Sequence, residues 1–212
     1  ALLLALSVQS SFAAPAPASV RFVHASPDTP AVDVFIDGAL VLSNVKYFAA
    51  SSSLSVPAGQ HTLQVAPTGQ GRDEAVVNDT IDLIRGRAYT LAATGKLENI
   101  KALALLDEQP KNLNGKAWVR VINATVGAPA IDVRLANAEA PLLTDQGFRT
   151  VDYLRVDPAT YTFEVAPAGT DQAFAISSPL RFEPGWNYTV ITTGLYNTSG
   201  VGIQAIVDRT AP

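Results

Sequence analysis

The chain contains no cysteine and no methionine among its 212 residues. Without cysteine, neither a disulfide framework nor a thiolate site can form, so any bound metal would need oxygen or histidine ligands. Histidine is scarce as well, because His24 and His61 are the only two. A zinc site would depend on carboxylates for most of its ligands, and we therefore exclude one.

Charged residues are few, at 16%, and the net charge is −4. No cluster of lysine or arginine occurs along the chain, and the basic excess needed to bind a phosphate backbone is lacking. No glycine-rich phosphate loop precedes a helix. We therefore expect no nucleic acid, no nucleotide and no cofactor. The 48% of hydrophobic residues is typical of a compact chain with a real core.

The first eighteen residues join a short apolar run, ALLLALSV, to a stretch of small residues, AAPAPAS. This order is typical of the hydrophobic and cleavage regions of a secretory signal peptide, and we expect removal after Ala18. The lack of methionine agrees with a residue 1 that is not the translational start. A spanning helix needs about 20 apolar residues, so we predict no transmembrane span in the mature chain.

A second interpretation keeps this segment on the mature protein, because its large apolar residues fall on one parity, as in a strand. An extended segment of that kind could complete the sheet of a neighbouring subunit by donor-strand exchange. The residues that would enter the neighbour are Leu2, Leu4, Leu6, Val8 and Phe12.

An internal repeat is the most informative feature of the sequence. Three blocks recur in the same order at an offset of 99 or 100 residues. They are VRFVHASPDTPAVDV (20–34) with VRVINATVGAPAIDV (119–133), VPAGQHTLQVAPTG (56–69) with VDPATYTFEVAPAG (156–169), and GRAYTLAATGKL (86–97) with GWNYTVITTGLY (185–196). Such a period indicates duplication of a domain of about a hundred residues.

Within the blocks, apolar and polar residues alternate between turn signals, as a strand with one wet face demands. Asp37-Gly38 is a hairpin signal. The pattern predicts five to seven short strands per copy and an all-β fold of two tandem antiparallel β-sandwiches. For 96–106, which has some helical character, we expect a loop and then a strand from Ile100 to Asp107, because the second copy has glycine and β-branched residues there.

The predicted organisation is a signal-peptide remnant or retained donor strand over 1–18, a first sandwich over 19–108, a linker over 109–116 and a second sandwich over 117–212. The linker is polar and rich in turn residues. A linker of this composition is compatible with many orientations of the two sandwiches.

The blocks VRFVHASPDTPAVDVFIDG, VPAGQHTLQVAPTG and GRAYTLAATGKL resemble the DUF4397 family, whose function is unknown. The resemblance covers nearly all of 19–209 as two copies. It implies export, often as tandem copies in bacterial envelope or surface proteins, and an immunoglobulin-like or transthyretin-like sandwich without known catalytic residues. The second copy departs from the pattern, since Asn123–Gly127 replaces His24–Asp28, whereas Asp132 matches Asp33.

His24, Ser26, Asp28 and Asp33 lie close in sequence and suggest a catalytic triad. Neither copy contains a nucleophile-elbow motif, and an activity tied to His24 or Asp28 would be missing from the second copy. We interpret the segment as a side-chain-stabilised turn between two strands and predict no catalytic residue. His24 and Asp28 remain candidates for binding.

Calcium is a further possibility, since Asp28, Asp33 and Asp37 supply hard oxygen ligands. The spacing of an EF-hand is not met, and Asp33 falls inside a strand pattern. We interpret these residues as ordinary turn and surface carboxylates and predict no bound metal.

Trp118 and Trp186 have no aromatic counterpart in the first copy, where Ser19 and Arg87 stand. A tryptophan specific to one copy could stack on a sugar or make an interdomain contact, and the sequence leaves both open.

Taken as a sequence, the chain is predicted to be a non-catalytic exported β-sandwich protein with a structural, adhesion or binding role. Its expected partners are cell-surface or envelope components, or copies of itself. Two alternatives are a filament subunit assembled through residues 1–12 and a carbohydrate-binding module. A hydrolase also stays open, because any two of the 19 acidic residues could meet in the fold.

Overall fold

The computed structural model describes residues 16–107, 110, 112–198 and 200–209. The proposed donor residues Leu2, Leu4, Leu6, Val8 and Phe12 lie outside the described residues. Within the described part, the helical segments are two short 3-10 turns, η1 (Arg72–Glu74) and η2 (Leu97–Asn99). None of the helices found in this part could cross a membrane.

The first half of the chain forms a sandwich of two four-stranded sheets, here called the N-terminal sandwich. Sheet A has the order β4-β1-β7-β8, and sheet B has the order β3-β2-β5-β6. The strands are β1 (Ala18–Ala25), β2 (Val32–Ile36), β3 (Ala39–Val45), β4 (Leu54–Val56), β5 (Gly59–Pro67), β6 (Val77–Leu83), β7 (Ala88–Thr94) and β8 (Lys101–Leu106).

The second half forms the C-terminal sandwich, with the same order in sheets C (β12-β9-β17-β18) and D (β11-β10-β14-β15) and a small sheet E (β13-β16). The strands are β9 (Ala117–Val126), β10 (Ile131–Leu135), β11 (Leu143–Gln146), β12 (Val151–Val156), β13 (Ala159–Tyr161), β14 (Phe163–Pro167), β15 (Ala175–Ile176), β16 (Leu180–Phe182), β17 (Asn187–Leu195) and β18 (Gly202–Arg209).

The all-β tandem-sandwich prediction is therefore confirmed, with more strands than expected. The N-terminal sandwich has eight strands, and the C-terminal sandwich has ten because two of its strands are interrupted. The counterpart of β5 breaks at Thr162 into β13 and β14. The counterpart of β6 breaks before Pro179, which has no amide hydrogen to donate to a ladder.

One strand pair in each sandwich is parallel, while the remaining pairs between described strands are antiparallel. The first strand of each half pairs in parallel with the strand that carries the Tyr-Thr segment, β1 with β7 and β9 with β17. The alternation of apolar residues does not encode strand direction, so this pairing was not predicted.

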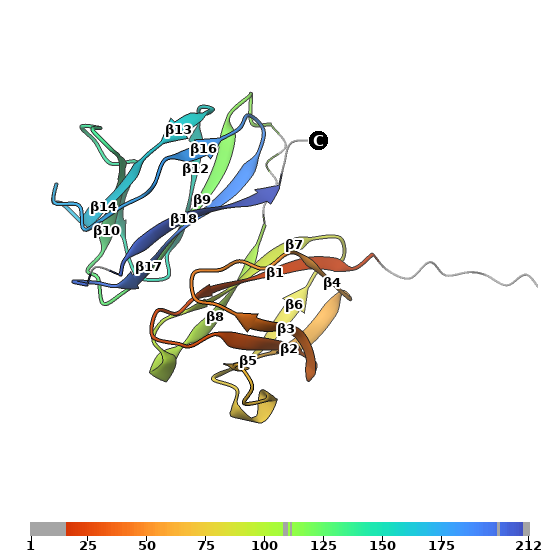
Figure 1. The fold of residues 1–212 in the computed structure, drawn as a ribbon. Helices are drawn as coiled ribbons and strands as arrows, with labels where there is room; N and C mark the ends of the chain where they lie inside the picture. The colour runs from red at the N-terminus through yellow and green to blue at the C-terminus, as the bar shows by residue number, and fades with distance from the viewer. Residues whose placement is uncertain (1–15, 108–109, 111, 199, 210–212) are drawn as a thin grey trace, which may run out of the picture.

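Each sandwich has its own core between its two sheets. Phe22, Leu63 and Leu91 are buried in the first, and Phe163, Phe182 and Val190 are buried in the second. A third apolar cluster joins the two halves. It includes Val23 and Ala92 of sheet A together with Ile122 and Ile191 of sheet C. The sheets therefore stack in the order B, A, C, D, with A and C at the junction (Figure 1).

This stacking buries both faces of the central strands, including polar residues that the sequence pattern assigned to a wet face. Arg21 on β1 is 6% exposed, and its Nε donates to Thr90 on the neighbouring β7 at 3.0 Å. The same guanidinium crosses the junction, where it forms an ion pair with Asp208 and donates to the carbonyl oxygen of Val207 at 2.9 Å.

The C-terminal sandwich repeats this arrangement toward the N-terminal one. Arg120 on β9 is 1% exposed, and its Nε donates to Thr189 at 3.0 Å. Its Nη2 lies 2.8 Å from Asp107 Oδ1, and its Nη1 donates to the carbonyl oxygen of Leu106 at 3.3 Å. Equivalent residues of the two halves thus make equivalent contacts, so the junction has approximate two-fold symmetry.

Equivalent loops also reach across the junction. The loop between β11 and β12 sends Arg149 to the N-terminal sandwich, where its Nε donates to Thr94 Oγ1 at 2.9 Å. The matching loop of the N-terminal sandwich places the Phe48 ring 3.1 Å from where a Cβ at Gly202 would lie, so a side chain there would require the ring to shift. The linker alone would permit many orientations, but these contacts select one.

Candidate functional site

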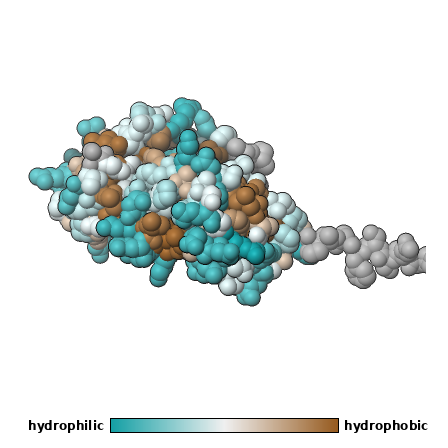
Figure 2. Space-filling model, turned by 60° about the horizontal axis from the view of Figure 1, so that its bottom comes forward, coloured by the Kyte–Doolittle hydropathy of each residue, from teal (hydrophilic) through white to brown (hydrophobic). Residues whose placement is uncertain are grey.

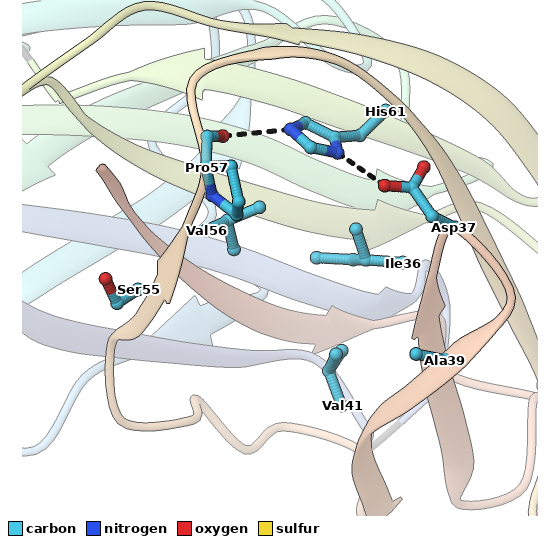
Figure 3. Close-up of a pocket in the computed structure, with 8 residues that line it drawn as sticks. All are labelled: Ile36, Asp37, Ala39, Val41, Ser55, Val56, Pro57 and His61. Atoms are coloured by element: carbon cyan, nitrogen blue, oxygen red, sulfur yellow. Dashed lines mark hydrogen bonds and ion pairs between the residues drawn. The ribbon is translucent and has the colours of Figure 1, made fainter. Parts of the chain in front are cut away.

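The N-terminal sandwich has a pocket of about 300 Å³ at the side where its two sheets separate (Figure 3). Strand β3 forms one wall and strand β4 the other, and both are edge strands. The lining is mostly apolar. Its residues are Ile36, Asp37, Ala39, Val41, Ser55, Val56, Pro57 and His61.

The polar end of the pocket is formed by His61, which bridges two turns (Figure 3). Its Nδ1 lies 2.6 Å from Oδ2 of Asp37, in the turn after β2. Its Nε2 lies 2.9 Å from the carbonyl oxygen of Pro57, in the turn after β4. The remaining oxygen of Asp37 accepts a hydrogen bond from the Thr62 amide at 2.9 Å.

The two titratable groups of this bridge shift each other's pKa. The hydrogen bond with Asp37 raises the pKa of His61 above its ordinary value, although burial opposes the shift. The same hydrogen bond, together with the Thr62 amide, lowers the pKa of Asp37. Both nitrogens of the ring face acceptors, so while the ring is protonated neither carries a lone pair that could act as a general base.

The sequence marked Asp37 as part of a hairpin turn and as a possible calcium ligand, and it marked His61 only as one of two histidines. Asp37 lies in the turn after β2 and His61 lies on β5, 24 residues later, so spacing does not reveal the pair. One signal was present, because His61 falls on the apolar parity of the β5 pattern with Leu63 and Val65.

The suggested triad of His24, Ser26 and Asp28 is not assembled. His24 is fully buried, donates from Nε2 to the carbonyl oxygen of Pro30 at 2.9 Å and accepts the Ser26 amide at Nδ1. Ser26 Oγ lies 2.6 Å from the carbonyl oxygen of Gly95, while Asp28 accepts the Leu97 amide at 2.9 Å. Burial lowers the pKa of His24, with the Pro30 hydrogen bond opposing the shift.

Asn123 explains how the second half does without this histidine. Its Oδ1 accepts the Thr125 amide at 3.0 Å, as His24 Nδ1 accepts that of Ser26. Its Nδ2 donates to the carbonyl oxygen of Gln146 at 2.9 Å. Both side chains therefore accept the amide two residues along and donate to a backbone carbonyl, although that carbonyl is Pro30 for His24 and Gln146 for Asn123, which supports a structural role for His24.

The acidic residues considered for calcium lie apart and are already used by the fold. Asp33 accepts the amides of Asn44 at 2.9 Å and Gly69 at 3.0 Å, so it ties strand β3 to the turn after β5. Its counterpart Asp132 does the same for Asp145 and Gly169, both at 2.9 Å. In the described part of the chain, no three His, Cys, Asp or Glu side chains gather as a metal site would require.

The two tryptophans occupy different environments. Trp118 lies on the face of sheet C that is turned toward the junction, stacked with Tyr153 at a centroid distance of 5.2 Å and with the Arg155 guanidinium 5.5 Å from its centroid. Trp186 packs against the C-terminal core and stacks with Tyr188 at 6.1 Å. Both rings therefore contact side chains of their own sandwich.

The fold and the repeat together define a tandem all-β sandwich protein. A family model, described as a domain of unknown function (DUF4397), matches residues 18–134. The chain belongs to this family. The match begins at β1 and ends within β10, so it reaches the first two strands of the C-terminal sandwich.

Solved structures of low similarity also match. The C-terminal domain of AlgF from P. aeruginosa is 17% identical, with 44% of this chain and 98% of that chain covered and a TM-score of 0.34. A family 26 carbohydrate-binding module of Eubacterium rectale is 12% identical, with coverages of 92% and 97% and a TM-score of 0.28.

A putative cell adhesion protein of Bacteroides ovatus is 8% identical, with coverages of 92% and 97% and a TM-score of 0.29. Scores this low carry no functional argument. No curated protein matches the chain.

Proposed function

We propose that the protein is a non-catalytic binding protein that acts outside the cytoplasm in a structural or adhesive role. The observation that carries the proposal is the hydrogen bonding of its only two histidines, His24 and His61. In each ring, both nitrogens lie within hydrogen-bond distance of a backbone or side-chain group of the protein itself. A histidine base for acyl or proton transfer is therefore missing, and Asp33 and Asp132 are likewise held by backbone amides.

The pocket between β3 and β4 is the proposed contact point. Large hydrophobic residues exposed elsewhere, such as Leu40, Ile84 and Ile176, come from separate elements. Hydrophobic residues on the face shown in Figure 2 likewise form small patches between hydrophilic ones. Scattered patches of this size are ordinary for a soluble surface, whereas a concave apolar site with few polar groups is the common form of a binding site.

The proposal is tested by a binding screen against envelope extracts, immobilised glycans and the protein itself, with oligomeric state measured by light scattering. Val41→Trp should fill the pocket and abolish the interaction. The matched control is Leu40→Trp, because the neighbouring Leu40 is 55% exposed and does not line the pocket. A strictly monomeric protein that binds nothing in the screen would end the proposal.

Export and the filament alternative are decided by one measurement. Mass spectrometry of the natural protein's N-terminus should find Ser19, as expected after signal-peptide removal. A chain that retains residues 1–12 would instead favour assembly by donor-strand exchange and a partner that is a copy of itself.

The carbohydrate alternative is favoured by one observation, the Trp118 stack that only the C-terminal sandwich has. By register, Trp118 and Arg155 take the places of Ser19 and Ser55. Loss of glycan-array signal in Trp118→Ala or Trp186→Ala would support this alternative, and an unchanged signal in both would remove it.

A further inference from the structure

The two acceptors around His61 can both be hydrogen-bonded in only one protonation state of the ring. A carboxylate and a carbonyl carry no proton to donate, so each contact is a hydrogen bond only if the facing ring nitrogen bears a hydrogen. The Nδ1 contact with Asp37 is 2.6 Å and the Nε2 contact with Pro57 is 2.9 Å. Only the protonated ring has hydrogens on both nitrogens.

The neutral ring must give up one of the two contacts. Hydrogen bonds to a charged acceptor are roughly twice as strong as neutral ones, so the remaining proton stays on Nδ1 beside Asp37. The Nε2 lone pair then faces the carbonyl lone pairs of Pro57, which is repulsive. The contact that ends on deprotonation is therefore the one that holds the β4–β5 turn.

The strands on either side hold this turn only at its two ends. Strand β4 has three residues, and it pairs with β1 through registers such as Ser19 with Ser55. Gly59, which begins β5, pairs with Leu83 of β6, adopts φ +130° and has open space where a side chain would lie. The turn also forms part of the pocket wall, because Val56 and Pro57 line the cavity.

We propose that His61 is a proton-dependent latch at the mouth of the pocket, which holds the β4–β5 turn against sheet B while the ring is protonated and releases it on deprotonation. The latch regulates the pocket, so its biological use rests on the proposed binding function. The latch itself can be measured without any ligand.

Asp37 is the neighbour that sets the direction of the pKa shift of His61. Asp37 is the one charged group that acts on the ring electrostatically. The residues that face it from β4 and the following turn are uncharged, as is Ile81, its register partner on β6. The pKa of His61 is raised, so the latch is closed below that pKa and opens as the pH rises through it.

The C-terminal sandwich contains only the turn-holding half of this bridge, and it lacks the switch. The amides of Asp37 and Ala136 donate to Thr62 and Thr162 at 2.9 and 2.8 Å, which places Ala136 at the position of Asp37. Tyr161 takes the place of His61, and its hydroxyl donates to the carbonyl oxygen of Asp157 at 2.9 Å, as His61 does to Pro57. A phenol keeps its proton throughout the neutral range, so this turn should stay held.

The test is a pH titration of the full chain by NMR. The ring nitrogens of two histidines give a simple spectrum, in which His61 should pass from the doubly protonated form to the neutral form with its proton on Nδ1. Amide exchange over 54–60, corrected for intrinsic pH dependence, should rise about fivefold across the same step, the factor for losing one neutral hydrogen bond. Exchange over 154–160 should show no such step.

Two variants sharpen the test. His61→Tyr copies the second half and should keep 54–60 protected at every pH. Asp37→Asn removes the charged acceptor, so it should move both the titration of His61 and the exchange step to lower pH.

Corrected exchange over 54–60 that does not change while His61 titrates would overturn the latch, and so would a neutral ring with its proton on Nε2. If His61→Tyr does not fold, the shift in Asp37→Asn still decides. Failure of the binding screen would leave these results untouched, so the two proposals fail separately.

Discussion

Replacing Arg120 by methionine is the sharpest test of the junction between the sandwiches. The side chain is 1% exposed, and its guanidinium lies within hydrogen-bond distance of Thr189, Leu106, Thr90 and Asp107. Methionine fills similar space but leaves the Asp107 carboxylate nearly buried with only Thr90 as a donor. Removing one partner of a buried ion pair costs about 3–5 kcal/mol, a large share of the usual 5–15 kcal/mol of total stability.

The assay is urea unfolding followed by tryptophan fluorescence and circular dichroism. Both tryptophans lie in the C-terminal sandwich, and circular dichroism reports on both halves, so separation of the two curves would reveal independent unfolding. The double variant Arg120→Met with Asp107→Leu removes both charges and should be more stable than Arg120→Met alone.

The matched control is Arg181→Ala, which breaks the exposed Arg181–Glu183 pair and should leave the urea midpoint unchanged. If Arg120→Met shifts the midpoint no more than this control does, the buried network does not hold the sandwiches together, and the argument from burial is refuted.

Two further substitutions test the structural roles of the family motif. His24→Asn introduces the residue found at Asn123. Because the pKa of His24 is lowered in the folded chain, the unfolded chain takes up a proton below about pH 6.5 that the folded chain does not, and the protein loses stability in acid. The variant should not show this loss, which urea midpoints at about pH 7.5 and about pH 5 measure. Asp33→Ala should cost about 1.5–3 kcal/mol near neutral pH, because it frees the amides of Asn44 and Gly69. Burial opposes the effect of these hydrogen bonds, but the pKa of Asp33 is still lowered, so the penalty should vanish as the pH falls through that lowered pKa.

The repeat and the strand patterns were enough to predict the fold class. Lys96–Leu106 was assigned to a loop and a strand by comparison with the second copy, and η2 followed by β8 confirms the assignment. The turn role of the His24 segment also agrees with its hydrogen bonds. These predictions worked because each rests on local chemistry, either alternation along a strand or a side chain that bonds to its own turn.

The junction could not be predicted in the same way. The pattern around Arg21 and Thr90 indicates strands with one apolar and one polar face, and a polar face is usually exposed to water. Here the polar faces of sheets A and C meet each other, and Arg21 finds Asp208 at a distance of 187 residues along the chain. Alternation reports which residues share a face, but it does not say whether that face meets water or another sheet.

Comparison of the two halves separates residues with the same structural role in both from residues that differ between them. Arg21 and Arg120 have the same identity and make the same contacts, so the fold and the junction account for them. His61 and Tyr161 make the same contact with different chemistry, and only the histidine can lose a proton near neutral pH. The fold alone would accept either side chain at this position. The difference between the halves therefore points to the wall of the pocket in the N-terminal sandwich as a place where a proton can change the structure.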